Sequence, residues 1–306
     1  MNELQKAQAK PVDMLKTIIK ADSVQEQFAN AMGAHKDAFV ASLIDLYAGD
    51  KALQTCKPQA VVMEALRAAT MKLPINKALG FAYIVVYNNS VKMPDGSWQK
   101  VPTPTFIPGY KGYIQLAMRT GQYKTINADV VYEGEISGYN KLAGTINFDG
   151  QKKSEKIIGY FAYIEMLNGF SKTLYMSVEE IASYAIRYSP SFKGRNKPSV
   201  ESLVKTAQAN EPSNKVGWEG NFNDMALKTV LRRLISKYGY LSVEMQAAVI
   251  GDVNSEAQAV RNDEIADTEV EEIADDEVET VGEAPAEPAP AKPAEAPAAD
   301  DEDMPY

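Results

Sequence analysis

The chain lacks several residue patterns on which common enzyme classes depend. Its 306 residues include one cysteine, Cys56, and one histidine, His35. A single cysteine excludes an internal disulfide framework and is consistent with a reducing compartment. A single histidine argues against a histidine-based metal centre or a serine–histidine catalytic pair, so we interpret both residues as structural. The sequence has no Gly-x-x-x-x-Gly-Lys-Ser/Thr loop, so nothing indicates a standard ATP-driven motor.

Long apolar segments are also missing. The chain has no run of about 18 apolar residues, so we expect no membrane span. Its N-terminus has no apolar core of a secretory signal. We therefore expect a cytoplasmic protein.

The formal net charge of −9 hides two segments of opposite sign. Residues 252–306 hold 19 acidic residues against two basic ones, which gives −17, whereas residues 1–251 hold 30 basic and 22 acidic residues, or +8. A basic body joined to an acidic tail points to a polyanion partner or to an interaction tail. The Ala- and Pro-rich run over 284–293 has too few large apolar groups to offset chain ordering. We therefore predict a disordered tail over 252–306.

Hydrophobic periodicity predicts helices at both ends of the body and strands in its centre. We expect helices over 11–48, 58–71, the segment that carries Lys111, 177–188 and 222–238, and strands over 81–87, 98–107, 126–132, 157–165 and near Leu174. The first two strands, with a turn signal at Pro94-Asp-Gly-Ser between them, resemble a hairpin. Ser177 with Glu180 forms a capping-box start. The order indicates an α+β fold for residues 1–251, with a helical N-terminal part, a central β-rich core that contains one inserted helix, and a C-terminal amphipathic helix.

The most informative stretch of the chain is Phe106–Lys124, FIPGYKGYIQLAMRTGQYK. It begins extended, passes through two glycines, and becomes a short helix. Four-residue spacing places Lys111, Gln115 and Arg119 along one helical edge, and Gly121 is a plausible C-cap. Basic and aromatic groups thus flank a turn whose glycines allow a ligand to approach the backbone closely. Such a surface suits a phosphate chain better than a small apolar substrate.

Two further segments combine bases with aromatic residues. In the predicted 222–238 helix, Lys228 and Arg232 lie one turn apart, opposite the apolar side. This edge is either an ordinary solvated face or a phosphate-contacting edge, with Trp218 upstream for stacking. The 187–197 segment, RYSPSFKGRNK, is either a soluble connector or a basic finger that closes over a strand.

Two alternative functions rest on shorter patterns. Gly109-Tyr-Lys-Gly112 fits the Gly-x-x-Gly loop of KH domains and would suit an RNA-binding chaperone, although the same glycines could serve packing. Asp129, Glu133 and Glu135 form an acidic cluster that could hold Mg²⁺ for phosphodiester cleavage by a nuclease. Alternatively, this cluster is simply the solvated face of a strand.

Four segments, taken in order, carry a family resemblance. They are Lys72–Tyr87, Gly109–Gln122, Ala128–Glu135 and Trp218–Leu234, with the strings GYKGYIQLAMRTG and ALKTVLRR as the most specific parts. Together they resemble the RecT family of phage and prophage single-strand annealing proteins, over roughly residues 10–250.

The resemblance implies an ATP-independent recombinase that is not an enzyme. Proteins of this kind coat single-stranded DNA as rings or filaments, anneal it to a complement in homologous recombination, and work beside a phage exonuclease inside a bacterial host. No covalent bond changes, so the resemblance implies no catalytic residue and no required cofactor. Whether Mg²⁺ modulates assembly stays open.

An annealing protein must accept any sequence, so it should bind phosphates and leave the base edges available for pairing. We expect phosphate contacts from the basic side chains, and base contact or site shaping from the aromatic ones. The candidates are Tyr110, Lys111, Arg119, Lys124, Lys193, Arg195, Lys197, Trp218, Lys228, Arg232 and Arg233. Arg232 and Arg233 alternatively form internal ion pairs.

The chain ends in Asp300–Tyr306, DDEDMPY. This tip is similar to the acidic, proline-then-aromatic terminus of bacterial single-strand DNA-binding proteins. Three interpretations stay open. The tip docks on host proteins that recognise such ends, the tail covers the basic groove and competes with DNA, or the tail only solubilises the chain.

Overall fold

The computed structural model describes residues 10–92, 96–192, 197–209 and 217–254. The chain divides into two compact units, Met1–Asp267 and Thr268–Tyr306, and every described residue belongs to the first. Most of the predicted acidic tail, from residue 255 onward, lies outside the described residues.

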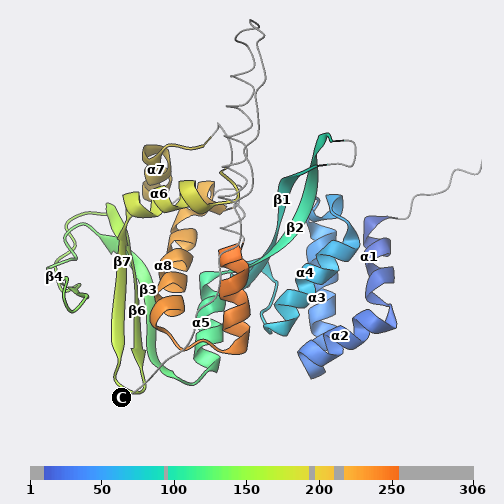
Figure 1. The fold of residues 1–306 in the computed structure, drawn as a ribbon, viewed down its shortest axis with the longest axis horizontal. Helices are drawn as coiled ribbons and strands as arrows, with labels where there is room; N and C mark the ends of the chain where they lie inside the picture. The colour runs from blue at the N-terminus through green and yellow to red at the C-terminus, as the bar shows by residue number, and fades with distance from the viewer. Residues whose placement is uncertain (1–9, 93–95, 193–196, 210–216, 255–306) are drawn as a thin grey trace, which may run out of the picture. The chain divides into compact units, whose positions relative to one another are not determined.

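Four helices form the N-terminal part of the first unit (Figure 1). They are α1 (Pro11–Ile19), α2 (Asp22–Met32), α3 (Lys36–Gly49) and α4 (Pro58–Thr70). Fully buried Leu15, Phe28 and Leu43 pack them together. The helical region expected over 11–48 is divided into three helices and a 3-10 turn. One break falls at Gly33, whose φ of +52° a helix does not allow.

A β-hairpin follows the helices. Strand β1 (Ala82–Lys92) pairs antiparallel with β2 (Trp98–Pro108), which confirms the predicted hairpin, and α4 packs against β2. A two-stranded sheet leaves both strands at an edge, so β2 tolerates Pro102 and Pro104.

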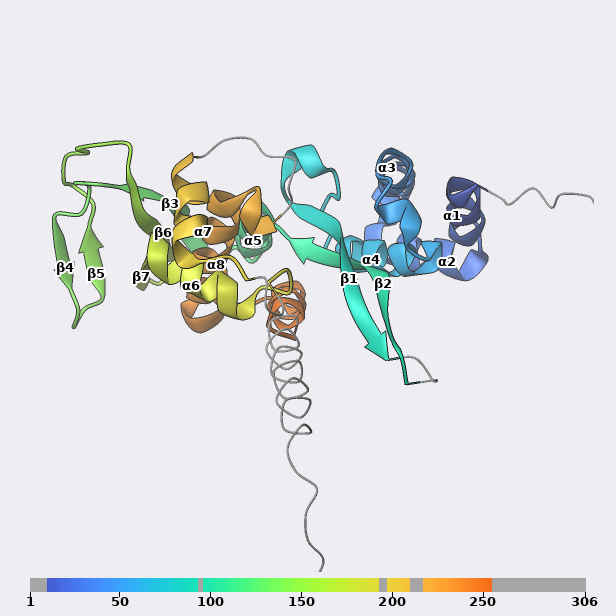
Figure 2. The same ribbon diagram turned by 90° about the horizontal axis from the view of Figure 1, so that it is seen from above.

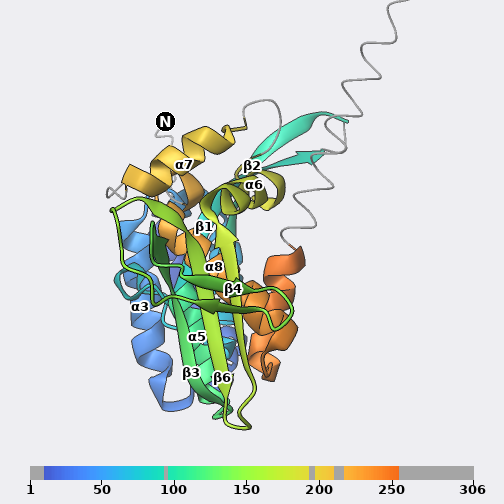
Figure 3. The same ribbon diagram turned by 90° about the vertical axis from the view of Figure 1, so that its left-hand side faces the viewer.

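Helix α5 (Tyr110–Arg119) connects this hairpin to a second sheet, as the sequence predicted. Strands β3 (Tyr123–Tyr132), β6 (Ile157–Met166) and β7 (Ser171–Ser177) form that sheet in the antiparallel order β3-β6-β7. Two short strands, β4 (Gly138–Asn140) and β5 (Thr145–Asn147), form an arm that crosses in front of the sheet in Figure 3.

Helices α6 (Val178–Tyr188), α7 (Val200–Ala209) and α8 (Phe222–Tyr238) complete the core, and residues 243–254 form a further helix. The predicted capping box of α6 is present, with Ser177 accepting from the Glu180 amide. None of the described helices is long and apolar enough to span a membrane.

Helix α8 lies between the three-stranded sheet and α5 (Figures 1 and 2). Tyr160, Ala162 and Ile164 alternate along β6 and are fully buried, and the Tyr160 ring lies 6.2 Å from that of Phe222 on α8. The helix predicted over 222–238 is confirmed, but Lys228 and Arg232 do not form the ordinary solvated face that was one of its two interpretations. Ten of the 17 residues of α8 are buried, Lys228 and Arg232 among them, because neighbouring elements cover several sides of the helix.

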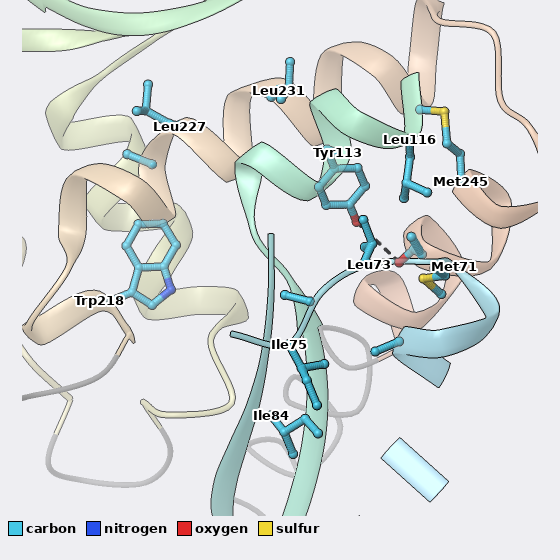
Figure 4. Packing of buried hydrophobic residues seen from close by; sticks show 14 of the residues in the cluster. Met71, Leu73, Ile75, Ile84, Tyr113, Leu116, Trp218, Leu227, Leu231 and Met245 are labelled. Atoms are coloured by element: carbon cyan, nitrogen blue, oxygen red, sulfur yellow. Dashed lines mark hydrogen bonds between the residues drawn. The ribbon is translucent and has the colours of Figure 1, made fainter. Parts of the chain in front are cut away.

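Two glycines fix the close approach of α5 to the chain around β1. A Cβ on Gly109 would lie 2.2 Å from the Gly80 carbonyl oxygen, and one on Gly112 would lie 2.2 Å from the Phe81 carbonyl oxygen. The side chains that follow Gly112, Tyr113 and Leu116, enter the core beside Met245 (Figure 4). The Gly109–Gly112 pair therefore serves packing.

We expect Gly112→Ala to destabilise the fold by about 1–3 kcal/mol, because the added methyl group overlaps a backbone carbonyl that cannot rotate away. Denaturant unfolding monitored by circular dichroism measures the change. Gly49→Ala is the control, since a Cβ there meets nothing within 4 Å and alanine favours a helix by about 0.5–1 kcal/mol. Equal stability of the two variants would contradict this account.

Candidate nucleic-acid interface

A cleft of about 380 Å³ is the strongest candidate for a binding site. Its lining residues come from α4, both strands of the β1–β2 hairpin, α6, the 3-10 turn at Gly217–Glu219, α8 and the helix over 243–254. Figure 2 shows the hairpin between the N-terminal helices on one side and α6 and α8 on the other. The cleft thus forms where the two halves of the unit meet.

Aromatic side chains line much of this cleft: Tyr87 from β1, Tyr184 and Tyr188 from α6, and Trp218. The rings of Tyr184 and Tyr188, one turn apart, lie 4.6 Å from each other. Trp218 packs edge-on against Phe222 at 5.3 Å and is only 5% exposed, so it shapes the wall. The half-buried tyrosines are the rings that can contact a base.

Three basic residues line the cleft as well: Arg67, Lys228 and Arg232. The Arg67 side chain is 67% exposed and lies 3.3 Å from the Glu64 carboxylate. On α8, Arg232 Nη2 donates to Tyr184 Oη at 2.6 Å, although the residue is only 5% exposed. Nearby, the Arg233 guanidinium lies 5.2 Å from the centre of the Tyr184 ring.

Two carboxylates balance part of this positive charge. Glu64 accepts from the Phe106 amide at 2.8 Å, which joins α4 to β2. Asp252 lies 3.0 Å from Lys228 Nζ and accepts from Tyr113 Oη at 2.7 Å. Each acid therefore has a structural partner.

The pKa of the Tyr87 hydroxyl lies well above its usual value. Burial is the main reason that the pKa of Tyr87 is raised to about 12, and the nearby Asp252 carboxylate adds to the effect, while a hydrogen bond with Ser191 opposes it. Like an ordinary tyrosine phenol, this hydroxyl is neutral at physiological pH and adds no negative charge where a phosphate chain would lie.

The structure brings four of the predicted residues to the cleft. Trp218, Lys228 and Arg232 line it, and Arg233 lies beside it over Tyr184. Lys228 and Arg232 are 8% and 5% exposed, so the basic edge predicted on α8 is largely an internal wall of the cleft.

The remaining described candidates lie outside the lining. Tyr110 and Lys111 stand at the start of α5, where Lys111 Nζ lies 5.9 Å from the Tyr110 ring. Arg119 donates to the carbonyl oxygens of Met71 and Lys72 at 2.7 and 2.8 Å, and so holds the end of α4. Lys124 pairs with Glu165 at 2.7 Å on the sheet.

In the predicted basic finger, Lys197 is exposed, and Lys193 and Arg195 lie outside the described residues.

Sequence reasoning missed Arg67, Tyr87 and Tyr184. The four-residue spacing of Tyr184 and Tyr188 was an available signal for an aromatic helix edge. No sequence signal pointed to Arg67, because the sequence does not show whether an arginine on an amphipathic helix faces water or a ligand.

The acidic cluster proposed for a nuclease does not converge. Glu133 contacts Ser154 at 2.8 Å, Glu135 accepts from the Tyr132 amide at 2.6 Å, and Asp129 accepts from the neighbouring Val130 amide. In the part of the chain that the structure describes, no three histidine, cysteine or acidic residues are placed to hold a metal ion. These carboxylates satisfy turns and a strand end.

The Gly-x-x-Gly sequence is not a loop between two helices, as it is in a KH module. Gly109 is the N-cap of α5 and Gly112 lies inside that helix.

An α+β core that carries a cleft of tyrosines and cations has the features of a protein that holds a nucleic-acid strand. The chain belongs to the RecT family, whose model matches residues 37–279. This membership assigns it to DNA-binding proteins of single-strand annealing and DNA recombination.

Two relatives cover most of the chain. It is 36% identical to the uncharacterized protein YqaK of Bacillus subtilis strain 168, over 88% of this chain and 86% of YqaK. It is 28% identical to protein RecT of Escherichia coli strain K12, over 77% of this chain and 79% of RecT.

We expect Arg119→Ala to lower stability by about 1–2 kcal/mol, because two carbonyl groups at the end of α4 lose a charged donor. Thermal and denaturant unfolding measure this loss. Lys124→Ala is the matched control, since its exposed ion pair with Glu165 contributes little. Unchanged stability in Arg119→Ala would show that these hydrogen bonds do not hold α4.

Stability should fall between about pH 10 and pH 12 through Tyr87. The raised pKa means that the folded state keeps a proton which the unfolded chain has lost in this window, so the favourable term is complete below pH 10 and disappears above pH 12. Tyr87→Phe should flatten the fall relative to wild type, by roughly 1 kcal/mol between pH 9 and pH 11. Urea unfolding at pH 9, 10 and 11 checks this slope, with Tyr139→Phe, whose residue is 64% exposed, as the control.

Proposed function

We propose that this protein binds single-stranded DNA in the cleft and anneals it to a complementary strand without ATP, as an oligomer along the DNA in phage-type recombination. One observation carries the proposal. The cleft places Arg67, Lys228 and Arg232 around the rings of Tyr87, Tyr184 and Tyr188.

Cations in such a cleft suit the backbone of any strand. Contacts to phosphates release counterions, and they supply affinity without reading the sequence. Tyrosine rings hold bases through their faces, which leaves the Watson–Crick edges available to a complement. Neutralising phosphates also lowers the repulsion between two strands, so the same contacts that bind the first strand favour the approach of the second.

The size of the cleft supports action by many subunits. A volume of about 380 Å³ accommodates only a few nucleotides at most, whereas stable pairing needs a longer duplex. Subunits arranged along the strand would present successive short segments in register. In this proposal the protein performs no covalent chemistry and requires no cofactor, although Mg²⁺ can modulate its assembly on DNA.

Two kinds of protein partner belong to the same proposal. A phage exonuclease would expose the strand that this protein covers. The acidic tip Asp300–Tyr306, which lies outside the described residues, would dock on host proteins that recognise the ends of single-strand DNA-binding proteins.

A two-step annealing assay tests this function. One labelled oligonucleotide is loaded with protein, its complement or a scrambled strand is added without ATP, and duplex formation is followed by fluorescence. We expect pairing with the complement alone. A labelled strand that becomes shorter in the presence of Mg²⁺ would instead indicate a nuclease.

Arg67→Ala tests the cleft itself, because this side chain is exposed and the variant should fold. Losing one phosphate contact should reduce the slope of log affinity against log salt by about 0.7 for single strands, and should slow annealing. Lys152→Ala removes one positive charge outside the cleft lining and should preserve both quantities. Identical behaviour of the two variants would exclude the cleft as the binding surface.

A further inference from the structure

The cleft contains an internal anion beside one of its cations. Lys228 Nζ lies 3.1 and 3.0 Å from the two carboxylate oxygens of Asp252, and both side chains line the cleft. These side chains are only 10% and 13% exposed. A carboxylate that contacts a lysine in this way offers the same charge and acceptor oxygens as one phosphodiester.

The rest of the structure holds this carboxylate in place. Tyr113 Oη donates to Asp252 at 2.7 Å and approaches the Ala248 carbonyl oxygen at 3.3 Å. Tyr113 itself is fully buried in α5, so its hydroxyl is a fixed donor. Asp252 is therefore positioned by two different helices, α5 and α8.

One face of the helix that carries Asp252 packs on the core. Met245 and Ala248 on this face are 0% and 2% exposed, whereas Ile250 and Val253 on the other face are 56% and 47% exposed. Gly251, directly before Asp252, weakens the helix by about 1 kcal/mol relative to alanine. The turn around Gly251 can thus open locally while Met245 and Ala248 stay in the core.

We propose that Lys228 binds a DNA phosphate and that the Asp252 carboxylate occupies the position of this phosphate in the DNA-free protein. When a single strand enters the cleft, a backbone phosphate replaces the Asp252 carboxylate on Lys228, and the turn around Gly251 opens. Asp252 thus acts as a tethered competitor that selects against weakly bound anions. This inference rests on the proposed function, because it assigns a phosphate contact and an autoinhibitory contact to the same cleft.

The exchange explains why a buried lysine is tolerated in the wall of a DNA-binding cleft. A buried charge without a partner would cost several kcal/mol, so Lys228 needs an anion in both states. Asp252 supplies it before DNA binds, and a phosphate supplies it afterwards. Displacing Asp252 then costs the turn around Gly251 and the hydrogen bond that Tyr113 donates to Asp252.

Binding of a fluorescent oligothymidylate to the full chain tests the proposal. Asp252→Asn should bind about tenfold more tightly than wild type at low salt, because a neutral amide of the same shape no longer competes for Lys228. Tyr113→Phe should give a smaller gain in the same direction, because it removes only the hydrogen bond that holds Asp252. Circular dichroism establishes that each variant is folded.

Glu155→Gln is the matched control. It changes the net charge by the same amount, but its side chain is 85% exposed and pairs with Lys152 outside the cleft lining. A gain in Asp252→Asn no larger than that in Glu155→Gln would overturn the proposal, since general charge would then explain both. The same holds if Asp252→Asn and Tyr113→Phe bind less tightly than wild type, because the three groups would then form only a structural network.

Hydrogen exchange on the wild-type protein gives a second test that does not depend on any variant folding. Amides over 249–254 should exchange faster when oligothymidylate is added, as the turn around Gly251 opens. Unchanged or slower exchange there would overturn the proposal. If wild type binds and anneals DNA yet shows no such increase, this inference alone fails, whereas a wild-type protein that neither binds nor anneals defeats the proposed function.

Discussion

The pairing of two nearly buried cations on α8 is the constraint on which the rest of the cleft depends. Lys228 and Arg232 are 8% and 5% exposed, and charges so far from water must meet polar partners. Asp252 meets the lysine, and the Tyr184 hydroxyl meets the arginine. These two contacts hold α6 and the helix over 243–254 against α8, and these elements form walls of the cleft.

The opposite wall depends on close backbone packing. Gly109 and Gly112 let α5 touch the chain around Gly80 and Phe81, directly before β1. This contact fixes where the β1–β2 hairpin leaves the core. The hairpin then presents Tyr87 to α6, while the Glu64 carboxylate binds the Phe106 amide and holds α4 against β2. The position of Tyr87 in the cleft thus follows from packing contacts between residues that are not candidates for DNA binding.

Much of the fold could be predicted from the sequence, because it is set by local patterns. Alternating apolar residues identified β3 and β6, Ser177 and Glu180 identified the start of α6, and the hairpin followed from two β-rich runs. Helix α8 was located with its exact bounds, Phe222–Tyr238, but its environment was not. Periodicity shows which side of a helix is apolar, yet it cannot show that other elements also cover the polar side.

For the candidate site, the sequence indicated the kind of ligand and some of the residues that line the cleft. Bases beside aromatic residues pointed to a nucleic-acid strand, and Trp218, Lys228 and Arg232 do share one cleft. The sequence by itself determined most of the elements, the charge division and the family. Only the tertiary structure decided that Arg67 and Tyr87 join this cleft, that Arg119 instead holds the end of α4, and that Asp252 lies against Lys228. Such contacts join residues far apart in the chain, and no local pattern encodes which distant side chain fills a given space.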